Sequence, residues 1–213
     1  CFLSMITLHP NGLLIGILPT VALMRDLVQR CEDNKIRAGC LYSGNRENTT
    51  VIERLTHRKL QALFVAPERL SDPRIWKAIQ KNCVHTVVVD EVHCLTEWGN
   101  EFRPMYRNIG KFIKDLSNSP VVAAFSATIM PDDISYIAKS LRMKNPVVHI
   151  GKLKRSNLTL KKAFVKNDAV RYAKVSKEIQ KCSSKGKIVI YCTRVCDVED
   201  MRDFLIEDCD ISA

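Results

Sequence analysis

The sequence predicts an α/β fold in which a mostly parallel sheet is flanked by helices on both faces. Short apolar runs alternate with amphipathic segments along most of the 213 residues, and 46% of the residues are hydrophobic, which is ample for a sizeable core. The run at residues 86–89 ends in two adjacent carboxylates, Asp90 and Glu91. This pattern is typical of a buried parallel strand whose carboxyl end delivers polar groups to a ligand.

Each expected element follows from its local pattern. The first 24 residues carry no formal charge, but turn residues at 9–12 (HPNG) and Pro19 interrupt them, so they predict a helix end, a turn and a buried strand rather than a membrane span. A basic leader region is also missing, which argues against a signal peptide. Apolar runs predict strands at residues 13–18, 36–42, 60–65, 84–89 and 121–125. Amphipathic stretches predict helices at residues 20–32, 47–57, 72–80 and 106–116, and residues 131–133 (PDD) are typical of a helix start.

The chain is expected to hold two incomplete domains. Residues 1–151 form the first α/β series, and the basic, polar residues 152–157 suit a linker. A second series occupies residues 158–213, with strands at 158–165 and 187–191 and helices at 169–182 and after Arg194. This series is too short to close a sheet of its own.

The net charge indicates the kind of partner, and the cysteines indicate which kinds of site are absent from the sequence. Thirty-three basic residues exceed 23 acidic ones, giving a net charge of +10 that favours a polyanionic partner or, alternatively, a solvated basic surface. The nine cysteines include no CxxC pair, which argues against a zinc ribbon or a thioredoxin-type site. Reduced thiols in an intracellular protein fit this pattern.

Residues 90–106 (DEVHCLTEWGNEFRPMY) carry the most informative motif. Two carboxylates at a strand end are costly to bury alone, and a divalent cation is their natural partner. The following loop is rich in aromatic and basic side chains, among them Trp98, Phe102 and Arg103. An acid pair joined to such a loop suggests a nucleotide site linked to a nucleic-acid sensor.

This block resembles the DEAHC-x-S-x-WGHDFRP-x-Y signature of RecQ-family helicases in superfamily 2. Further similarities follow in the family's order: PTVALMRDLV at residues 19–28 is similar to motif Ia, VAPERL at 65–70 to motif Ib, FSAT at 125–128 to motif III, RSNL at 155–158 to the junction of the helicase domains, and IVIYCTR at 188–194 to motif IV. The resemblance implies a RecA-like ATP-binding domain, truncated at its N-terminus, and the start of a second RecA-like domain.

The resemblance also implies catalytic roles. Asp90 would hold Mg²⁺ through water, and Glu91 would orient and polarise the water that attacks the γ-phosphate of ATP. His93 would link the phosphate site to the aromatic loop, although a structural histidine is the alternative. Ser126 and Thr128 would couple hydrolysis to domain movement, whereas without the resemblance they are ordinary turn residues.

Nucleic-acid contacts are implied in the same way. Trp98 and Phe102 would contact single-stranded DNA or relay its presence, and Arg103 would bind phosphate or transmit that signal. A hydrophobic plug that packs the loop down is the alternative for the aromatic residues. The expected contacts to the phosphate backbone are Thr20, Arg69 and Arg194.

One departure from the family is an absence. A P-loop requires G-x-x-x-x-G-K-[ST], and none of the three Gly-Lys pairs of this chain, at residues 110, 151 and 186, precedes Ser or Thr. The opening Cys1-Phe2 matches the register just after a RecQ P-loop, so the sequence is expected to start directly beyond it. Motifs V and VI, which follow motif IV in the family, are missing too.

The expected function is therefore that of a fragment of a RecQ-like, ATP-dependent 3′–5′ DNA helicase acting in DNA repair and recombination. The alternative is a catalytically inactive, nucleic-acid-binding remnant; an RNA helicase is disfavoured by the aromatic loop. The implied cofactors are ATP and Mg²⁺, and the implied partners are single-stranded DNA and duplex junctions, with no membrane. A nuclear location is expected, with bacterial cytoplasm as the alternative. The preferred DNA structure, the oligomeric state and any protein partners do not follow from the sequence.

Overall fold

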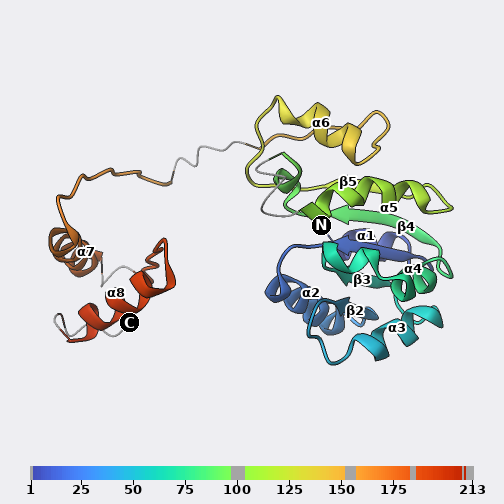
Figure 1. Cartoon of the computed structure of the whole chain (residues 1–213), viewed down its shortest axis with the longest axis horizontal. Coiled ribbons are helices and arrows are strands. Elements are labelled where there is room, and N and C mark those ends of the chain that lie inside the picture. Colours follow the sequence, from blue (N-terminus) through green and yellow to red (C-terminus); the bar gives the residue numbers. More distant parts are fainter. Residues whose placement is uncertain (1, 97–103, 152–156, 183–185, 208, 210–213) are drawn as a thin grey trace. The chain divides into compact units, whose positions relative to one another are not determined.

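The computed structural model describes residues 2–96, 104–151, 157–182, 186–207 and 209. The chain divides into two compact units, Cys1–His149 and Ile150–Ala213 (Figure 1). Within the described residues, no helix combines the length and the apolar composition that crossing a membrane requires.

The first unit is built on a five-stranded parallel sheet, as predicted (Figure 1). The strands lie in the order β2-β3-β1-β4-β5, and every neighbouring pair is parallel. Their bounds are β1 Leu13–Ile17, β2 Ala38–Leu41, β3 Ala62–Val65, β4 Val84–Val89 and β5 Val121–Ala124. Because all five strands run in one direction, their carboxyl ends meet at one edge of the sheet, where a ligand site is expected.

Helices cover both faces of this sheet. Along β1, Leu13, Ile15 and Ile17 belong to one buried cluster, whereas Leu14 and the following Leu18 belong to another, because successive strand side chains point to opposite faces. The second cluster includes buried residues of α1 (Phe2–Leu8) and α2 (Val21–Asp33). The first includes those of α3 (Asn48–Thr56), α4 (Pro73–Ile79), α5 (Ile109–Asp115) and α6 (Asp133–Ser140).

The described residues also include three short 3₁₀ turns. These are η1 (Pro67–Ser71) after β3, η2 (Val92–Leu95) after β4, and η3 (Pro104–Asn108) before α5. The single helix expected over residues 106–116 is therefore split into η3 and α5. Gly110 allows α5 to approach the end of α6 closely, since a Cβ at this position would collide with the backbone carbonyl of Ser140. The Arg142 Nε also donates to the Gly110 carbonyl at 3.2 Å, so the two helices are joined at this point.

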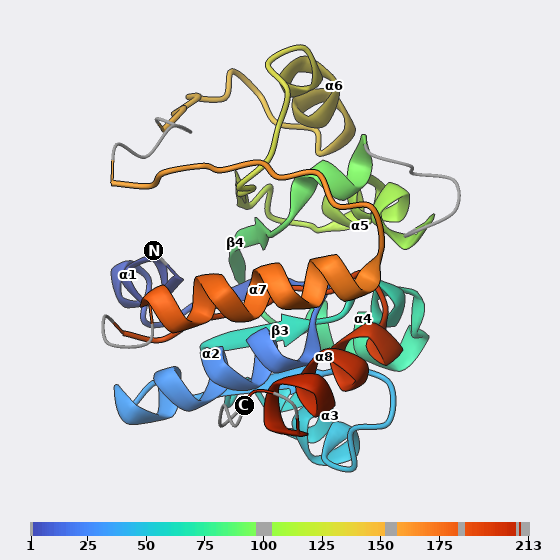
Figure 2. The ribbon, with the colours of Figure 1, turned by 90° about the vertical axis from the view of Figure 1, so that its left-hand side faces the viewer.

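The second unit contains α7 (Asp168–Cys182) and α8 (Val195–Glu207), which lie beside each other (Figures 1 and 2). A small core joins them: Ile179 of α7 clusters with Met201 and Leu205 of α8. The rings of Tyr172 and Phe204 add a tilted aromatic contact with centroids 5.1 Å apart.

The two strands expected in this unit, at residues 158–165 and 187–191, are wrong for the described structure, which assigns no strand there. A strand needs a hydrogen-bonded neighbour, and the described residues of this unit pair neither segment with one. Several of their apolar side chains stay in solvent: Leu160 is 95% exposed and Tyr191 is 92% exposed. Ile190 is partly buried and packs against the small core of this unit. The division into two RecA-like domains at residues 152–157 remains a prediction, since residues 152–156 lie outside the described part of the chain.

Candidate nucleotide and nucleic-acid site

Asp90 and Glu91 lie at the carboxyl end of β4. The Asp90 amide donates to the Ile17 carbonyl at 3.0 Å, so the β1–β4 pairing extends to the first carboxylate. Glu91 then adopts a left-handed backbone (φ 50, ψ 46), and its amide donates to the Asp90 Oδ1 at 3.0 Å. Such a conformation is uncommon for a residue with a Cβ and is concentrated at functional sites. Both carboxylates are therefore turned out of a buried strand into a half-buried position at the sheet edge.

The loop after β4 is tied to the loop after β5. The Phe125 amide donates to the Val89 carbonyl at 2.9 Å, and the Val92 amide donates back to the Phe125 carbonyl at 3.0 Å. This exchange continues the parallel ladder beyond the last strand residues. Residues 90–93 and 125–128, which are far apart in the sequence, consequently share one position at the carboxyl edge.

His93 connects the two loops through its side chain. Its Nδ1 lies 2.8 Å from the Ser126 Oγ and 3.2 Å from the Glu91 Oε2. With a proton on Nδ1, the ring donates toward these oxygens, and the Ser126 hydroxyl donates to the Thr128 carbonyl at 3.4 Å. The Thr128 amide in turn donates to the Ser126 Oγ at 3.3 Å. Four of the residues predicted for hydrolysis and coupling thus form one hydrogen-bonded chain.

Tyr106 is a part of this site that sequence reasoning missed. The side chain is fully buried, and its hydroxyl donates to the Asp90 carbonyl at 3.1 Å. A buried tyrosine hydroxyl needs such a partner, so the contact supports the turn that presents Asp90. The signal available in the sequence was its place as the last residue of the DEVHCLTEWGNEFRPMY block.

Thr20 lies beyond the end of β1 at the same sheet edge and immediately precedes α2. Its backbone is extended, and its side chain is exposed and makes no capping hydrogen bond to the helix. The hydroxyl is thus available for another acceptor or donor at the start of α2.

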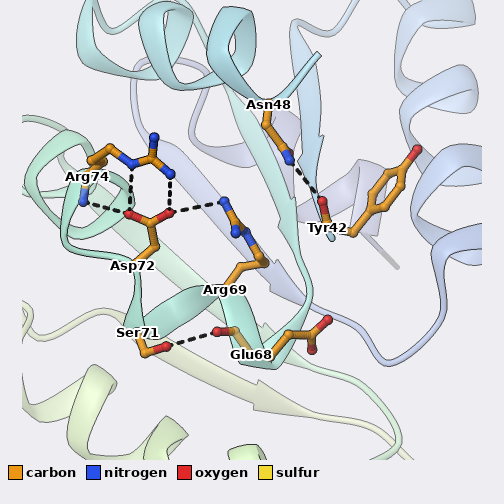
Figure 3. A network of polar contacts seen from close by, with 7 residues as sticks. All are labelled: Tyr42, Asn48, Glu68, Arg69, Ser71, Asp72 and Arg74. Carbon is orange, nitrogen blue, oxygen red and sulfur yellow. Dashed lines mark hydrogen bonds and ion pairs between the residues drawn. The ribbon is translucent and has the colours of Figure 1, made fainter. Parts of the chain in front are cut away.

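Arg69 lies in η1, just after β3, and belongs to a network around Asp72 (Figure 3). The Arg69 Nη2 binds the Asp72 Oδ2 at 3.1 Å, and Arg74 binds the same carboxylate through Nε at 3.2 Å and Nη2 at 2.9 Å. These contacts, led by the hydrogen bond from Arg74, lower the pKa of Asp72 below its usual value. Two guanidinium groups share one carboxylate, so the network keeps a net positive charge.

Two buried polar atoms in the region drawn in Figure 3 have no hydrogen-bond partner among the described residues. The Arg69 Nε is buried without a hydrogen-bond partner among the described residues. Asn48, at the start of α3, donates to the Tyr42 carbonyl at 2.9 Å, and its own Oδ1 is likewise buried without a described partner (Figure 3). An unsatisfied buried donor costs about 1–3 kcal/mol, so an acceptor that reached Arg69 would be bound favourably.

The remaining predicted contacts lie in the second unit or outside the described residues. Arg194 belongs to the second unit, where its exposed guanidinium binds the Asp197 Oδ1 at 2.8 Å, and this hydrogen bond raises its pKa. Trp98, Phe102 and Arg103 lie outside the described residues.

The described residues contain no group of three or more His, Cys, Asp or Glu side chains that could hold a metal ion by themselves. Magnesium does not require such a group, because it is usually bound through one or two carboxylates together with the phosphates and water. Asp90, at a strand end with an adjacent second carboxylate, fits this mode of binding.

Residues 2–136 match the family model described as DEAD/DEAH box helicase. Similar curated proteins include the ATP-dependent DNA helicase RecQ of Bacillus subtilis, 36% identical over 71% of this chain and 26% of the relative. The probable ATP-dependent DNA helicase RecS of the same species is 30% identical over 85% of this chain and 36% of the relative. The mouse ATP-dependent DNA helicase Q5 is 29% identical over 64% of this chain and 15% of the relative.

Solved structures share the fold. The DEAD-box helicase Mss116, bound to ssRNA and UDP-BeF, matches with a TM-score of 0.64 and 17% identity over 98% of this chain and 46% of that chain. A hypothetical ATP-dependent RNA helicase from Sulfolobus tokodaii matches with a TM-score of 0.51 and 22% identity over 67% of this chain and 41% of that one. The chain therefore spans less than half of the length of these proteins.

Proposed function

Because the chain belongs to the DEAD/DEAH box helicase family, and RecQ helicases are among its relatives at 28–36% identity, we propose that it supplies part of the motor of a RecQ-like ATP-dependent DNA helicase. The family uses ATP with a divalent metal and acts on nucleic acid. DNA unwinding in the 3′–5′ direction, with a role in repair and recombination, is the finer part of this proposal.

One observation carries the proposal: the hydrogen-bonded chain from Glu91 through His93 to Ser126. It links the carboxylate expected at the attacking water to the loop expected to sense domain movement. A change in the position of Ser126 would shift the His93 ring, which would in turn shift the Glu91 carboxylate. Such a connection suits an enzyme in which nucleic acid and hydrolysis control each other.

Each carboxylate would have a separate task. Asp90 would hold Mg²⁺, which neutralises charge that develops on the phosphates. Glu91, which is 39% exposed, would accept a hydrogen bond from water and orient it in line with the γ-phosphate. His93 would hold the Glu91 carboxylate in place rather than take part in the reaction itself.

The nucleic-acid contacts would lie along the carboxyl edge and beyond it. Thr20 and Arg69, which follow β1 and β3, are proposed to bind the phosphate backbone. The net positive charge of the Arg69–Asp72–Arg74 network supports this role. Trp98, Phe102 and Arg103 are proposed to contact single-stranded DNA, and Arg194 to do so from the second unit.

The second candidate function, nucleic-acid binding without hydrolysis, is favoured by one feature. The 213 residues contain no P-loop, whose backbone amides and lysine hold the phosphates in enzymes of this kind. We therefore propose hydrolysis for a helicase that includes this sequence and not for these residues alone.

The test is Glu91→Gln in a helicase that carries this sequence together with a P-loop. ATP hydrolysis should fall at least about a hundredfold, because the amide cannot polarise the attacking water, while affinity for single-stranded DNA is retained. Glu32→Gln, an exposed change at the end of α2, is the matched control and should leave both unchanged. Normal hydrolysis in Glu91→Gln would refute the assigned role.

A further inference from the structure

A stripe of lysines runs along the exposed side of α7. Lys174, Lys177 and Lys181 are spaced by three and four residues, so they lie on one helix face, and all three are exposed. The opposite face carries Ser176 and Ile179, which are buried against the small core with α8. The lysines, called here the α7 basic stripe, therefore stay in solvent because the folding of the unit uses the other face.

Basic residues outnumber acidic residues in the sequence around this stripe. The described residues 157–187 contain eight lysines and arginines against two acidic residues, whereas the described residues from 188 onward contain two against five. Basic charge is thus concentrated along the sequence before and within α7, although the charge of Asp197 in α8 also reaches Arg171 of α7. A segregation of this kind favours a polyanion over general solubility.

Glu178 is the acidic residue within the stripe, and cations from two segments surround it. The Lys181 Nζ binds its Oε1 at 2.6 Å, and this hydrogen bond, followed by the charges of Lys161 and Lys174, lowers the pKa of the Glu178 carboxyl. Lys161 comes from the segment before α7. The basic surface therefore extends beyond the helix, and one carboxylate does not neutralise it.

An exposed aromatic ring lies in the same segment as Lys161, before α7. Phe164 is 85% exposed, and the Lys162 Nζ lies 5.0 Å from the centroid of its ring. An exposed ring beside a lysine is typical of surfaces on which bases stack while cations bind the backbone. An acidic peptide offers the charge without a base to stack, so the combination favours nucleic acid.

We propose that the α7 basic stripe, with Phe164, binds the phosphate backbone of single-stranded nucleic acid, as a contact separate from the residues of the helicase motifs. The three lysines span about 10 Å along the helix axis, enough to face two or three successive phosphates. This surface holds the strand on the second unit by charge and stacking, without reading its sequence. The choice of nucleic acid as occupant rests on the proposed function.

The test compares the complete 213-residue chain with its Lys174→Gln/Lys177→Gln/Lys181→Gln variant, using labelled oligo(dT) between about 50 and 200 mM salt. Each lost phosphate contact lowers the slope of log affinity against log salt by about 0.7, so the slope should fall by about two. Phe164→Ala should weaken binding about tenfold with little change in the slope. Glu178→Gln should strengthen binding, because it removes the acidic residue from the stripe.

The matched control is Lys111→Gln/Lys114→Gln/Lys139→Gln, which removes the same charge from exposed lysines of α5 and α6. An equal loss of slope in both variants, or no loss in the α7 variant, would overturn the proposal. So would equal displacement of oligo(dT) by poly-glutamate or by anionic vesicles at matched charge. None of these outcomes affects the Glu91→Gln result, which tests the proposed function separately.

Discussion

The backbone of Glu91 is left-handed at a position of the proposed site, a conformation it shares with five other described non-glycine residues. A left-handed conformation costs a residue with a Cβ about 1–2 kcal/mol, and no helix cap or turn glycine relieves it here. The strain persists because hydrogen bonds hold the turn on both sides: the Glu91 amide donates to the Asp90 carboxylate, and the Val92 amide donates to the Phe125 carbonyl. The fold thus accepts a cost at the position where the proposed mechanism needs a carboxylate.

This cost predicts a separation of stability from activity. Glu91→Gly should raise the free energy of unfolding of the chain by about 1 kcal/mol, since glycine adopts the left-handed region freely. Urea unfolding followed by circular dichroism measures the change. Glu91→Gln, which keeps the Cβ, should leave stability unchanged. Lys35→Gly provides a positive control, because Lys35 has a similar φ of 58; destabilisation by Glu91→Gly alone would contradict the argument.

His85 makes the stability of the first unit depend on pH. It contacts His9, with ring centroids 4.7 Å apart, and its Nδ1 lies 2.7 Å from the Thr86 Oγ1. Burial, and then the charge of His9, lower the pKa of His85 below its usual value near 6.5. The unfolded chain therefore binds the proton more readily than the folded chain, so this contribution to stability is present above about pH 6.5 and is lost as pH falls below it.

The urea midpoint should accordingly drop between about pH 7.5 and 5.5 more for the unmodified chain than for His85→Gln, which does not titrate. Groups that do not contact His85 change both proteins equally, so the difference isolates the contact between His85 and His9. Equal pH dependence in the two chains would assign the effect elsewhere.

At the scale of elements, Asp72 holds the start of α4. Its Oδ1 accepts from the Arg74 amide at 2.9 Å, which is an N-cap contact, and Pro73 occupies the first helical position. The same carboxylate binds Arg69, so one side chain serves both a helix and a proposed phosphate contact. This double use explains why an acidic residue lies within a surface expected to bind a polyanion.

Two substitutions separate these tasks. Asp72→Asn keeps a capping oxygen but loses the charge, whereas Asp72→Ala loses both. The alanine variant should lower the free energy of unfolding by about 1–2 kcal/mol, and the asparagine variant by less. Thermal or urea unfolding checks the order, with Ser71→Ala, an exposed neighbouring change, as the control. Equal losses in both Asp72 variants would show that charge, not capping, stabilises this turn.

At the scale of the whole molecule, the phosphate site is incomplete within the sequence. In the proposed mechanism Asp90 and Glu91 hold a cation and a water, but the sequence contains no P-loop to bind the phosphates. The 213-residue chain should therefore show negligible ATP hydrolysis with or without single-stranded DNA, as measured by phosphate release. Salt-dependent binding of oligo(dT) by the same sample would show that the protein is folded and binds nucleic acid. Turnover at rates ordinary for helicases would contradict the proposal.

The strands of the first unit, their mostly parallel arrangement and the position of the acid pair followed from the sequence alone, whereas the strand order did not. Residues 84–89 were predicted as a strand with the observed limits, because a short β-branched apolar run that ends in two charged residues is typical of a buried strand. The helices of both units were predicted within a few residues for the same reason, since amphipathic spacing is a local property. The family resemblance was equally local: it rested on contiguous residues, and the comparisons confirmed it.

The tertiary structure decided what local patterns do not contain. The contacts of His93 with Ser126 and of Tyr106 with Asp90 join residues 33 and 16 positions apart, and they depend on which strands become neighbours. The prediction of strands at residues 158–165 and 187–191 was wrong because it, too, depended on contacts that a local pattern does not contain. Their sequence suits a strand, but a strand exists only when another backbone completes its hydrogen bonds, and that is a property of the assembled sheet.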